Sequence, residues 1–231
     1  MKFATALEFG ILLKRYQRFL ADVKLDSGDT ITAHCPNSGS MKGVNVPGSR
    51  VAVSYHPNPA RRLQYTWELI ELDGGWVGVN TLLPNRLAAE AFEHGLIPRF
   101  RRYRSYRAEA KISADTRIDF VLGELERMWV EVKNVTLVEA GIARFPDSVT
   151  ARGTKHLEHL LRHVRGGGQA AMLYVCQHHA AERFTSADEI DPVYGAALRR
   201  AHAAGVAIEV WKAAVAPTEI LLTTKLPFFL T

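Results

Sequence analysis

Apolar and polar residues alternate along much of the first third of the chain, a pattern typical of half-buried β-strands. Phe19, Ala21, Val23 and Leu25 occupy every second position ahead of a turn-forming Asp-Ser-Gly-Asp segment. Short strands with few helix signals, over about 80 residues, favour a small barrel of the oligonucleotide-binding (OB) type. Further strands are predicted at residues 30–34 and 50–55, with a hairpin of residues 63–72 and 76–80 around Asp73-Gly-Gly75.

The pattern changes at Pro84, a residue that suits the first turn of a helix. A helical apolar stripe then runs from Leu87 to Phe92, and Gly95 ends it. Strands and helices alternate from there on, and Asp191 is the expected N-cap of the last helix. Strands are predicted at residues 105–112, 117–122, 128–135, 169–177 and 206–211, and helices at residues 150–164 and 192–204.

This order of elements predicts an α/β (α+β) protein in two parts. Residues 1–82 are expected to form an OB-like β-barrel with a nucleic-acid-binding role, and residues 83–231 a mixed α/β domain. With 231 residues, of which 47% are hydrophobic, the chain is long enough to bury a core in each part.

Charge and cysteine content narrow the possible functions. The formal net charge of +5 suggests an anionic partner. Cys35 and Cys176 lie far apart, which argues against a disulfide framework. Glu8 and Gly10 interrupt the first apolar run, so no signal peptide is expected, and no stretch approaches the length of a membrane span. We therefore expect a cytoplasmic protein without a membrane partner.

Two neighbouring predicted strands carry the residues best suited to chemistry. Glu131 and Lys133 share one face of their strand, because successive side chains of a strand point to opposite faces. If the preceding strand pairs with it through the turn at residues 123–126, Asp119 lies beside Glu131. Two carboxylates could then bind Mg²⁺ or Mn²⁺, while the ammonium orients water or stabilises phosphate charge. A half-exposed strand with a surface ion pair is the open alternative.

Basic residues are concentrated just before these strands and on one helix. Forked arginine donors suit phosphate groups. The aromatic residues between the arginines, Phe100, Tyr103 and Tyr106, are expected to pack onto the core rather than against bases. The candidate phosphate-binding residues are Arg99, Arg101, Arg102, Arg104 and Arg107 before the strands, and Arg152, Lys155 and His156 on the helix at residues 150–164.

A polar loop in the barrel is a second candidate for phosphate binding. Asn37, Ser38, Gly39 and Ser40 offer hydroxyl, amide and main-chain donors, although ordinary turn chemistry favours the same residue types. His178-His179 follows a predicted strand, and a surface loop is expected there.

Together these motifs resemble the sugar fermentation stimulation protein A (SfsA) family over nearly the whole chain. The resemblance implies an OB-like barrel followed by a domain like the PD-(D/E)xK restriction-endonuclease-like nucleases. It also implies bacterial DNA binding without marked sequence preference and a regulatory role in sugar (maltose) metabolism. The matching segments are Cys35-Pro-Asn-Ser-Gly-Ser-Met41, Arg117-Ile-Asp-Phe120, Val130-Glu-Val-Lys-Asn-Val-Thr136 and the stretch from Phe145 to Leu157.

The resemblance assigns roles by position. Asp119 corresponds to the first acid of the nuclease motif, Glu131 to the second acid and Lys133 to the motif lysine, although Ile118 stands where the broad motif has proline. Pro146-Asp147 looks like the missing Pro-Asp, but it follows Glu131 and therefore has the wrong order.

Three hypotheses remain open. In the first, Asp119, Glu131 and the carbonyl of Val132 hold Mg²⁺ or Mn²⁺ in a DNA-binding phosphodiesterase, with Glu109 or Glu90 as a possible further acid. In the second, the same fold only binds DNA and plays a regulatory part without catalysis. In the third, the protein hydrolyses nucleotides or small phosphate compounds.

Overall fold

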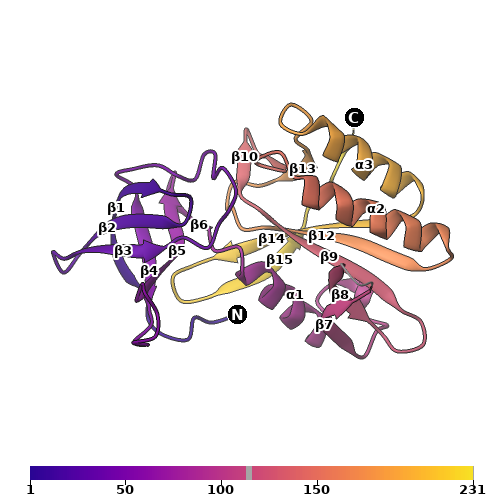
Figure 1. Ribbon diagram of the computed structural model, residues 1–231, viewed down its shortest axis with the longest axis horizontal. Coiled ribbons are helices and arrows are strands. Elements are labelled where there is room, and N and C mark those ends of the chain that lie inside the picture. Colours follow the sequence, from indigo (N-terminus) through magenta and orange to yellow (C-terminus); the bar gives the residue numbers. More distant parts are fainter. Residues whose placement is uncertain (113–115, 231) are drawn as a thin grey trace.

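The computed structural model describes residues 1–112 and 116–230. Two lobes lie side by side along the long axis of the molecule, an N-terminal β-barrel and a larger α/β lobe (Figure 1). Within these ranges, every helix lacks the length and apolar character that crossing a membrane requires.

Antiparallel pairing of neighbouring strands builds most of the barrel, and parallel pairing of its third and fifth strands closes it. Leu12, Val23, Trp67 and Ile70 fill the interior and are fully buried. Of the alternating residues in the sequence, Ala21, Val23 and Leu25 face this interior, as expected for a half-buried strand, whereas Phe19 is exposed. The barrel strands are β1 (Glu8–Tyr16), β2 (Leu20–Leu25), β3 (Thr30–His34), β4 (Arg50–Tyr55) and β5 (Tyr65–Leu72), and β6 (Gly75–Gly78) pairs with β5 outside the closure.

The α/β lobe is organised around a mixed sheet in the order β15-β14-β12-β9-β8-β7. Its central strands β9, β12 and β14 are parallel to one another, and antiparallel strands flank them. These strands are β7 (Tyr106–Lys111), β8 (Arg117–Leu122), β9 (Met128–Val135), β12 (Gln169–Cys176), β14 (Ala207–Val215) and β15 (Ile220–Lys225). A smaller sheet consists of β10 (Leu137–Glu139), β11 (Ile142–Phe145) and β13 (Arg183–Ser186).

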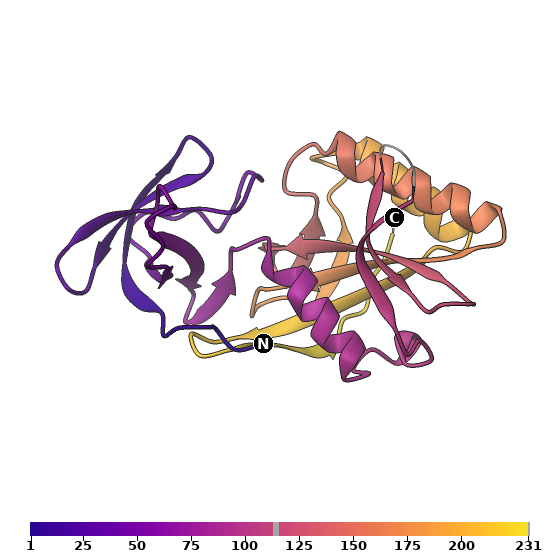
Figure 2. The ribbon, with the colours of Figure 1, turned by 60° about the horizontal axis from the view of Figure 1, so that its bottom comes forward.

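Helices cover both faces of the central sheet, which gives the lobe three layers (Figure 2). The helices are α1 (Leu83–Glu93), α2 (Ala151–Arg165) and α3 (Pro192–Ala203), with a short 3₁₀ turn η1 (Pro98–Phe100) after α1. Leu157 and Leu160 of α2 and Leu198 of α3 pack together on one face. Leu87 and Ala91 of α1 pack on the other face. The stripes spaced three and four residues apart are the buried sides of these helices.

The two lobes meet closely along β6. The Gly78 amide donates to the Gln177 carbonyl at 2.9 Å, and Val77 forms a β-bridge with His178. A Cβ atom on Gly78 would come within 2.5 Å of the Gln177 side-chain oxygen, so any larger residue here would displace the Gln177 side chain. His178 is consequently buried at this junction, so the expectation of a surface loop is wrong for His178, whereas His179 lies in the turn that follows and is half-buried.

The first residues of the chain belong to the α/β lobe rather than to the barrel. Met1 is buried in the core beneath α1, and its carbonyl accepts from the Ile220 amide at 2.9 Å. Lys2 forms an antiparallel bridge with Glu219. The chain therefore starts on the α/β lobe, crosses to build the barrel and returns at α1.

Candidate metal and phosphate site

The candidate site lies where β8 and β9 separate. Their ladder pairs Phe120 with Val130 and does not continue to Glu131 within the described register. The Asp119 carboxylate enters this gap and accepts from the Val132 amide at 2.8 Å, replacing the missing main-chain partner. Because the N–H and C=O of one strand residue point to the same side, the Val132 carbonyl also faces Asp119. The second carboxylate oxygen of Asp119 accepts from the side-chain amide of Asn85 of α1 at 3.1 Å.

Glu131 is held by two basic side chains, Lys133 of its own strand and His156 of α2, the helix that covers this face of the sheet. Its Oε1 accepts from Lys133 Nζ at 2.6 Å and is in hydrogen-bond contact with His156 Nδ1. Only 1% of its side chain is exposed, compared with 17% for Lys133. Glu131 Oε2 is buried without a hydrogen-bond partner among the described residues. A buried carboxylate oxygen in this state is costly unless a ligand satisfies it.

The two carboxylates differ in their acid–base behaviour. Burial and the neighbouring charge of Glu131 raise the pKa of Asp119 above its ordinary value. Burial also acts to raise the pKa of Glu131, but contacts with His156 and Lys133 outweigh it and lower that pKa. Two acids whose pKa values are pushed apart in this way are typical of functional sites.

The site's chemistry suits a hard divalent cation. Glu131 Oε2 has coordination capacity to spare, and each Asp119 oxygen keeps a lone pair beyond its single hydrogen bond. Over residues 1–112 and 116–230, no three His, Cys, Asp or Glu side chains are grouped to hold a metal ion. Mg²⁺ is commonly held by one or two carboxylates, with water and substrate phosphate completing its shell. The two acids and the Val132 carbonyl fit that pattern.

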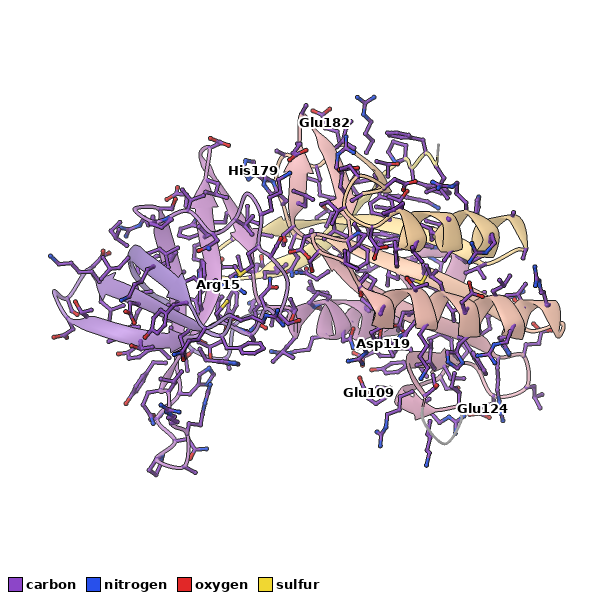
Figure 3. All side chains as sticks on the ribbon, turned by 45° about the horizontal axis from the view of Figure 1, so that its top comes forward. Arg15, Glu109, Asp119, Glu124, His179 and Glu182 are labelled. Carbon is purple, nitrogen blue, oxygen red and sulfur yellow. The ribbon has the colours of Figure 1, made fainter. Side chains whose placement is uncertain are left out.

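The two further acids differ in position. Glu109 lies opposite Asp119 on β7, between the paired residues at positions 108 and 110, and Figure 3 shows the two residues close together beside α2. Its φ of 48° is unusual for a non-glycine residue in a strand. Glu90 instead forms an ion pair with the N-terminal ammonium of Met1 at 2.6 Å. Asn85, and not Glu90, is the α1 residue that contacts Asp119.

Two cavities adjoin the site and share Arg152. One, of about 720 Å³, lies between the lobes and is lined by Lys133, Arg144 and Arg18 among others. The other, of about 480 Å³, extends over β7 and β8, where Lys155 and His156 line it with Glu109. We call these two cavities together the basic groove. Arg152 and Lys155 are exposed in it, whereas His156 is buried and engages Glu131 rather than solvent.

The polar loop at residues 37–40 lines the barrel side of this groove. Part of its donor capacity is taken by Asp147, whose carboxylate accepts from the Met41 amide at 2.9 Å and from Ser40 Oγ at 3.3 Å. A Cβ atom on Gly39 would come within 2.5 Å of that carboxylate. Of the donors that the sequence offered to phosphate, Ser40 Oγ is therefore taken by Asp147, whose main-chain carbonyl is its nearest acceptor at 2.6 Å, while Ser38 still lines the groove.

The arginine-rich segment lies apart from the basic groove. Arg99 and Arg102 line a third cavity together with Trp211, which belongs to the core on the α1 face. Arg101, Arg104 and Arg107 are exposed near the turn after α1 and on β7. Phe100 is buried between this segment and α1, as expected for a core aromatic.

Two contacts of the site have no counterpart in the sequence patterns. Asn85 reaches Asp119 across 34 positions, and His156 reaches Glu131 across 25. Neither residue carries a local signal for its partner.

Comparison with known proteins gives the same two-part division. Residues 13–79 match the family described as SfsA N-terminal OB domain, and residues 82–219 match the family described as Sugar fermentation stimulation protein RE domain. A "Sugar fermentation stimulation protein homolog" of Geobacter metallireducens is 53% identical over 232 residues, an alignment that spans 100% of both chains. The homolog of Geobacter sulfurreducens is 52% identical over 94% of both chains.

A solved structure shares the fold. It is described as Pyrococcus furiosus SfsA in complex with Ca²⁺, and it matches with a TM-score of 0.90 over 99% of this chain and 98% of that chain. The sequence identity is 23%, so this similarity concerns the arrangement of the chain.

Proposed function

The chain belongs to the sugar fermentation stimulation protein family, and on that premise we propose that it binds DNA and hydrolyses phosphodiester bonds with Mg²⁺ or Mn²⁺. The observation that carries the proposal is the pair Asp119 and Glu131 beside Lys133. One buried carboxylate oxygen of this pair lacks a partner among the described residues, and Lys133 beside it lines the basic groove.

Each residue has a distinct part in this chemistry. Asp119, Glu131 Oε2 and the Val132 carbonyl would hold the cation, which when bound activates water and offsets charge on the phosphate. Lys133 would leave its partner Glu131 for the scissile phosphate or the attacking water. His156 keeps Glu131 oriented when Lys133 moves, because it contacts the same carboxylate oxygen. Asn85 fixes the Asp119 carboxylate in the gap between the strands.

The basic groove is the proposed path of the nucleic acid. The cavity between the lobes contains Arg18 from the barrel, together with Lys133, Arg144 and Arg152 from the α/β lobe. Cationic side chains along a groove bind phosphates whatever the base sequence, so weak sequence preference is expected. A regulatory effect on sugar fermentation, as the family's name implies, would then need a partner or local DNA structure to direct it.

The structural relative adds support for a divalent cation. Its description reports a complex with Ca²⁺, a hard cation that takes oxygen ligands like those assembled here. We extend this to the present chain as part of the proposal.

The proposal is tested by incubating labelled single- and double-stranded DNA with Mg²⁺ or Mn²⁺. Wild type should cleave at least one substrate, and Lys133→Ala should lose most of that activity. Lys24→Ala, which removes an exposed lysine from β2, is the matched control and should cleave normally. Lys133→Gln keeps a hydrogen bond to Glu131 and separates loss of charge from local disorder. Absence of metal-dependent cleavage in wild type would end the phosphodiesterase proposal.

A binding module without catalysis is the second candidate. The observation in its favour is that Glu131 Oε1 already contacts both Lys133 and His156, so a cation must share this carboxylate with two basic groups. This candidate predicts that DNA affinity, measured by fluorescence anisotropy, is equal with Mg²⁺ and with EDTA, and that DNA remains intact.

A further inference from the structure

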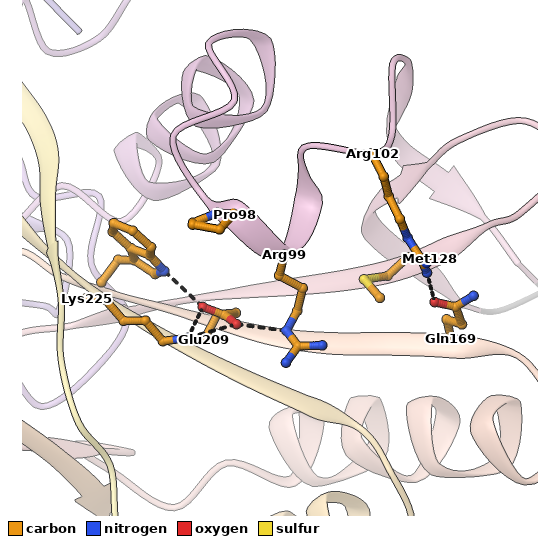
Figure 4. Close-up of a pocket in the computed structure, with 8 residues that line it drawn as sticks. Pro98, Arg99, Arg102, Met128, Gln169, Glu209 and Lys225 are labelled. Carbon is orange, nitrogen blue, oxygen red and sulfur yellow. Dashed lines mark hydrogen bonds and ion pairs between the residues drawn. The ribbon is translucent and has the colours of Figure 1, made fainter.

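The cavity lined by Arg99, Arg102 and Trp211 lies on the α1 face of the central sheet, away from the basic groove. It has a volume of about 560 Å³ and is placed at the start of β9 and β12, where Met128 and Gln169 line it (Figure 4). Met128 and Trp211 belong to the core on the α1 face, whereas Glu131 points to His156 of α2. The cavity is therefore separated from the candidate metal site by the sheet itself.

A buried carboxylate organises this cavity. Glu209 of β14 is only 1% exposed in its side chain, and Trp211 Nε1 donates to it at 3.1 Å. Arg99 Nε donates to one carboxylate oxygen at 2.8 Å, and Lys225 Nζ lies 2.9 Å from the other. Burial acts to raise the pKa of Glu209, but the contacts with Lys225 and Arg99 outweigh it and lower that pKa, so the carboxylate is ionised at neutral pH.

The ion pair with Glu209 leaves hydrogen-bond donors of Arg99 directed at the cavity. Arg99 uses its Nε for Glu209, and its two terminal amino groups have no hydrogen-bond partner among the described residues. Figure 4 shows these two groups on the side of the guanidinium away from the carboxylate. Arg102 is held on the opposite wall by Gln169. Because Glu209 is the sole acid among the described residues lining this cavity, Arg99, Arg102 and Lys225 leave it with an excess of positive charge.

We propose that this cavity is a phosphate-binding site, independent of the metal site, for a small phosphorylated molecule or a backbone phosphate of bound nucleic acid. A guanidinium fixed through Nε presents its two amino groups in the planar fork that matches two oxygens of a phosphate. The volume is typical of a small-ligand site, and Pro98, Met128 and Trp211 supply apolar surface for the rest of the ligand.

Calorimetric titration without divalent metal tests this site. The probes are inorganic phosphate, adenosine 5′-monophosphate and a short oligothymidylate without terminal phosphate. Arg99→Gln and Lys225→Gln should each weaken binding of the effective probe by about tenfold or more, because each removes a charge-assisted hydrogen bond. Arg165→Gln, which removes an exposed arginine from the last turn of α2 outside this cavity and the basic groove, is the matched control and should bind like wild type.

The pattern across probes identifies the source of the phosphate. Arg99-dependent binding of phosphate or the mononucleotide supports a small phosphorylated ligand, and Arg99-dependent binding of the oligothymidylate alone supports a backbone phosphate. Binding of none of the probes, or equal binding by Arg99→Gln and Arg165→Gln, would overturn the site.

A further variant, Glu209→Gln, distinguishes a preorganised phosphate site from general attraction to a positive surface. Glu209→Gln adds net positive charge but weakens the hold on Arg99, so weaker binding supports a preorganised fork, and tighter binding would contradict it. A melting curve confirms that this buried variant is folded. Because these titrations contain no divalent metal, their outcome does not depend on the proposed phosphodiesterase, whose failure would appear as the absence of metal-dependent cleavage by wild type.

Discussion

At the scale of single residues, the central feature is the contrast between Asp119 and Glu131. Glu131 has two basic partners, whereas the described donors to Asp119 are neutral and the charge of Glu131 lies nearby. The protein therefore stabilises one carboxylate as an anion and leaves the other in need of a cation. Such an arrangement lowers the stability of the metal-free protein, and binding of the cation would restore it.

Replacing Asp119 with asparagine should stabilise the metal-free protein at neutral pH. Burial and Glu131 raise the pKa of Asp119, so the stability that its protonated form contributes is lost as the pH rises through the folded-state pKa. Asparagine does not ionise and avoids this loss. We expect the melting temperature at neutral pH to rise by about 2–4 °C, the shift that roughly 1 kcal/mol produces in a protein of this size, and Mg²⁺ binding to disappear.

The pH dependence provides the control for this prediction. The advantage of Asp119→Asn should vanish in acid, where wild type is protonated at this position. Asp22→Asn should behave oppositely, because hydrogen bonds from Thr32 and Tyr16 outweigh burial and lower the pKa of Asp22. Its contribution is present above the ordinary aspartate range and lost in acid. Differential scanning calorimetry across pH measures both variants, and a less stable Asp119→Asn at neutral pH would refute the argument.

Part of the site follows from sequence and part does not. Alternation along one strand is enough to place Glu131 and Lys133 on the same face, and the structure has them in contact. The gap that receives Asp119 depends on where two strands stop pairing, which no local pattern specifies. The basic strip of its helix predicts His156 as a phosphate ligand, but helix orientation buries it against Glu131.

At the scale of elements, α2 connects stability with the site. Thr150 caps its start by accepting from the Gly153 amide at 3.1 Å. Leu157 and Leu160 then fix the helix against the sheet, and this orientation brings His156 to Glu131 and exposes Arg152 to the groove. A shift of α2 would therefore alter the site and the groove together.

Leu160→Ala measures how strongly this packing holds. Leu160 is fully buried, so its truncation should lower the free energy of unfolding by about 2–5 kcal/mol through lost burial and a remaining cavity. Leu125→Ala makes the same chemical change at a side chain that is 100% exposed in the β8–β9 turn, and it should cost less than about 0.5 kcal/mol. Urea unfolding compares the two, and similar losses would argue against the packing described for α2.

Strands are located accurately where turn residues and hydrophobic patterning mark their ends, and are missed where these local signals are weak. The strands predicted at residues 30–34, 50–55, 117–122 and 128–135 have the bounds observed, because turn residues flank apolar or alternating runs. β1 escapes prediction, since Glu8–Tyr16 combines a continuous apolar run with a glycine and does not alternate. In the smaller sheet, β11 and β13 pair with each other although they lie far apart in sequence, which a local pattern does not contain. β10 and β15 instead form hairpins with neighbouring strands.

At the scale of the whole molecule, the basic groove depends on both lobes. The loop at residues 37–40 closes onto Asp147 of the α/β lobe, and the cavity beside Lys133 is bounded on one side by the barrel. Neither lobe alone would form this cavity. The long motifs around Gly39 and Asp147 are therefore linked by a direct contact between them.

The groove predicts a specific salt dependence of DNA binding. Arg152→Gln should weaken binding at low salt and reduce the slope of log affinity against log salt by about 0.7–0.9, the value for one phosphate contact. Arg165→Gln removes an exposed arginine from the last turn of the same helix, outside the groove, and should leave the slope unchanged. Anisotropy titrations at several salt concentrations measure both slopes. An equal effect of the two variants would place the DNA elsewhere.

The pairing of the first residues with the strand edge near Ile220 has a consequence for how the protein is made. Met1 and Ile220 are 219 residues apart in sequence, so the partner of this segment is synthesised long after the segment itself. At about 5–20 residues per second, the ribosome needs roughly ten to forty seconds to reach it. Until then the barrel can close, but the segment before it has no docking place, and a stalled or shortened translation product would carry that apolar end exposed.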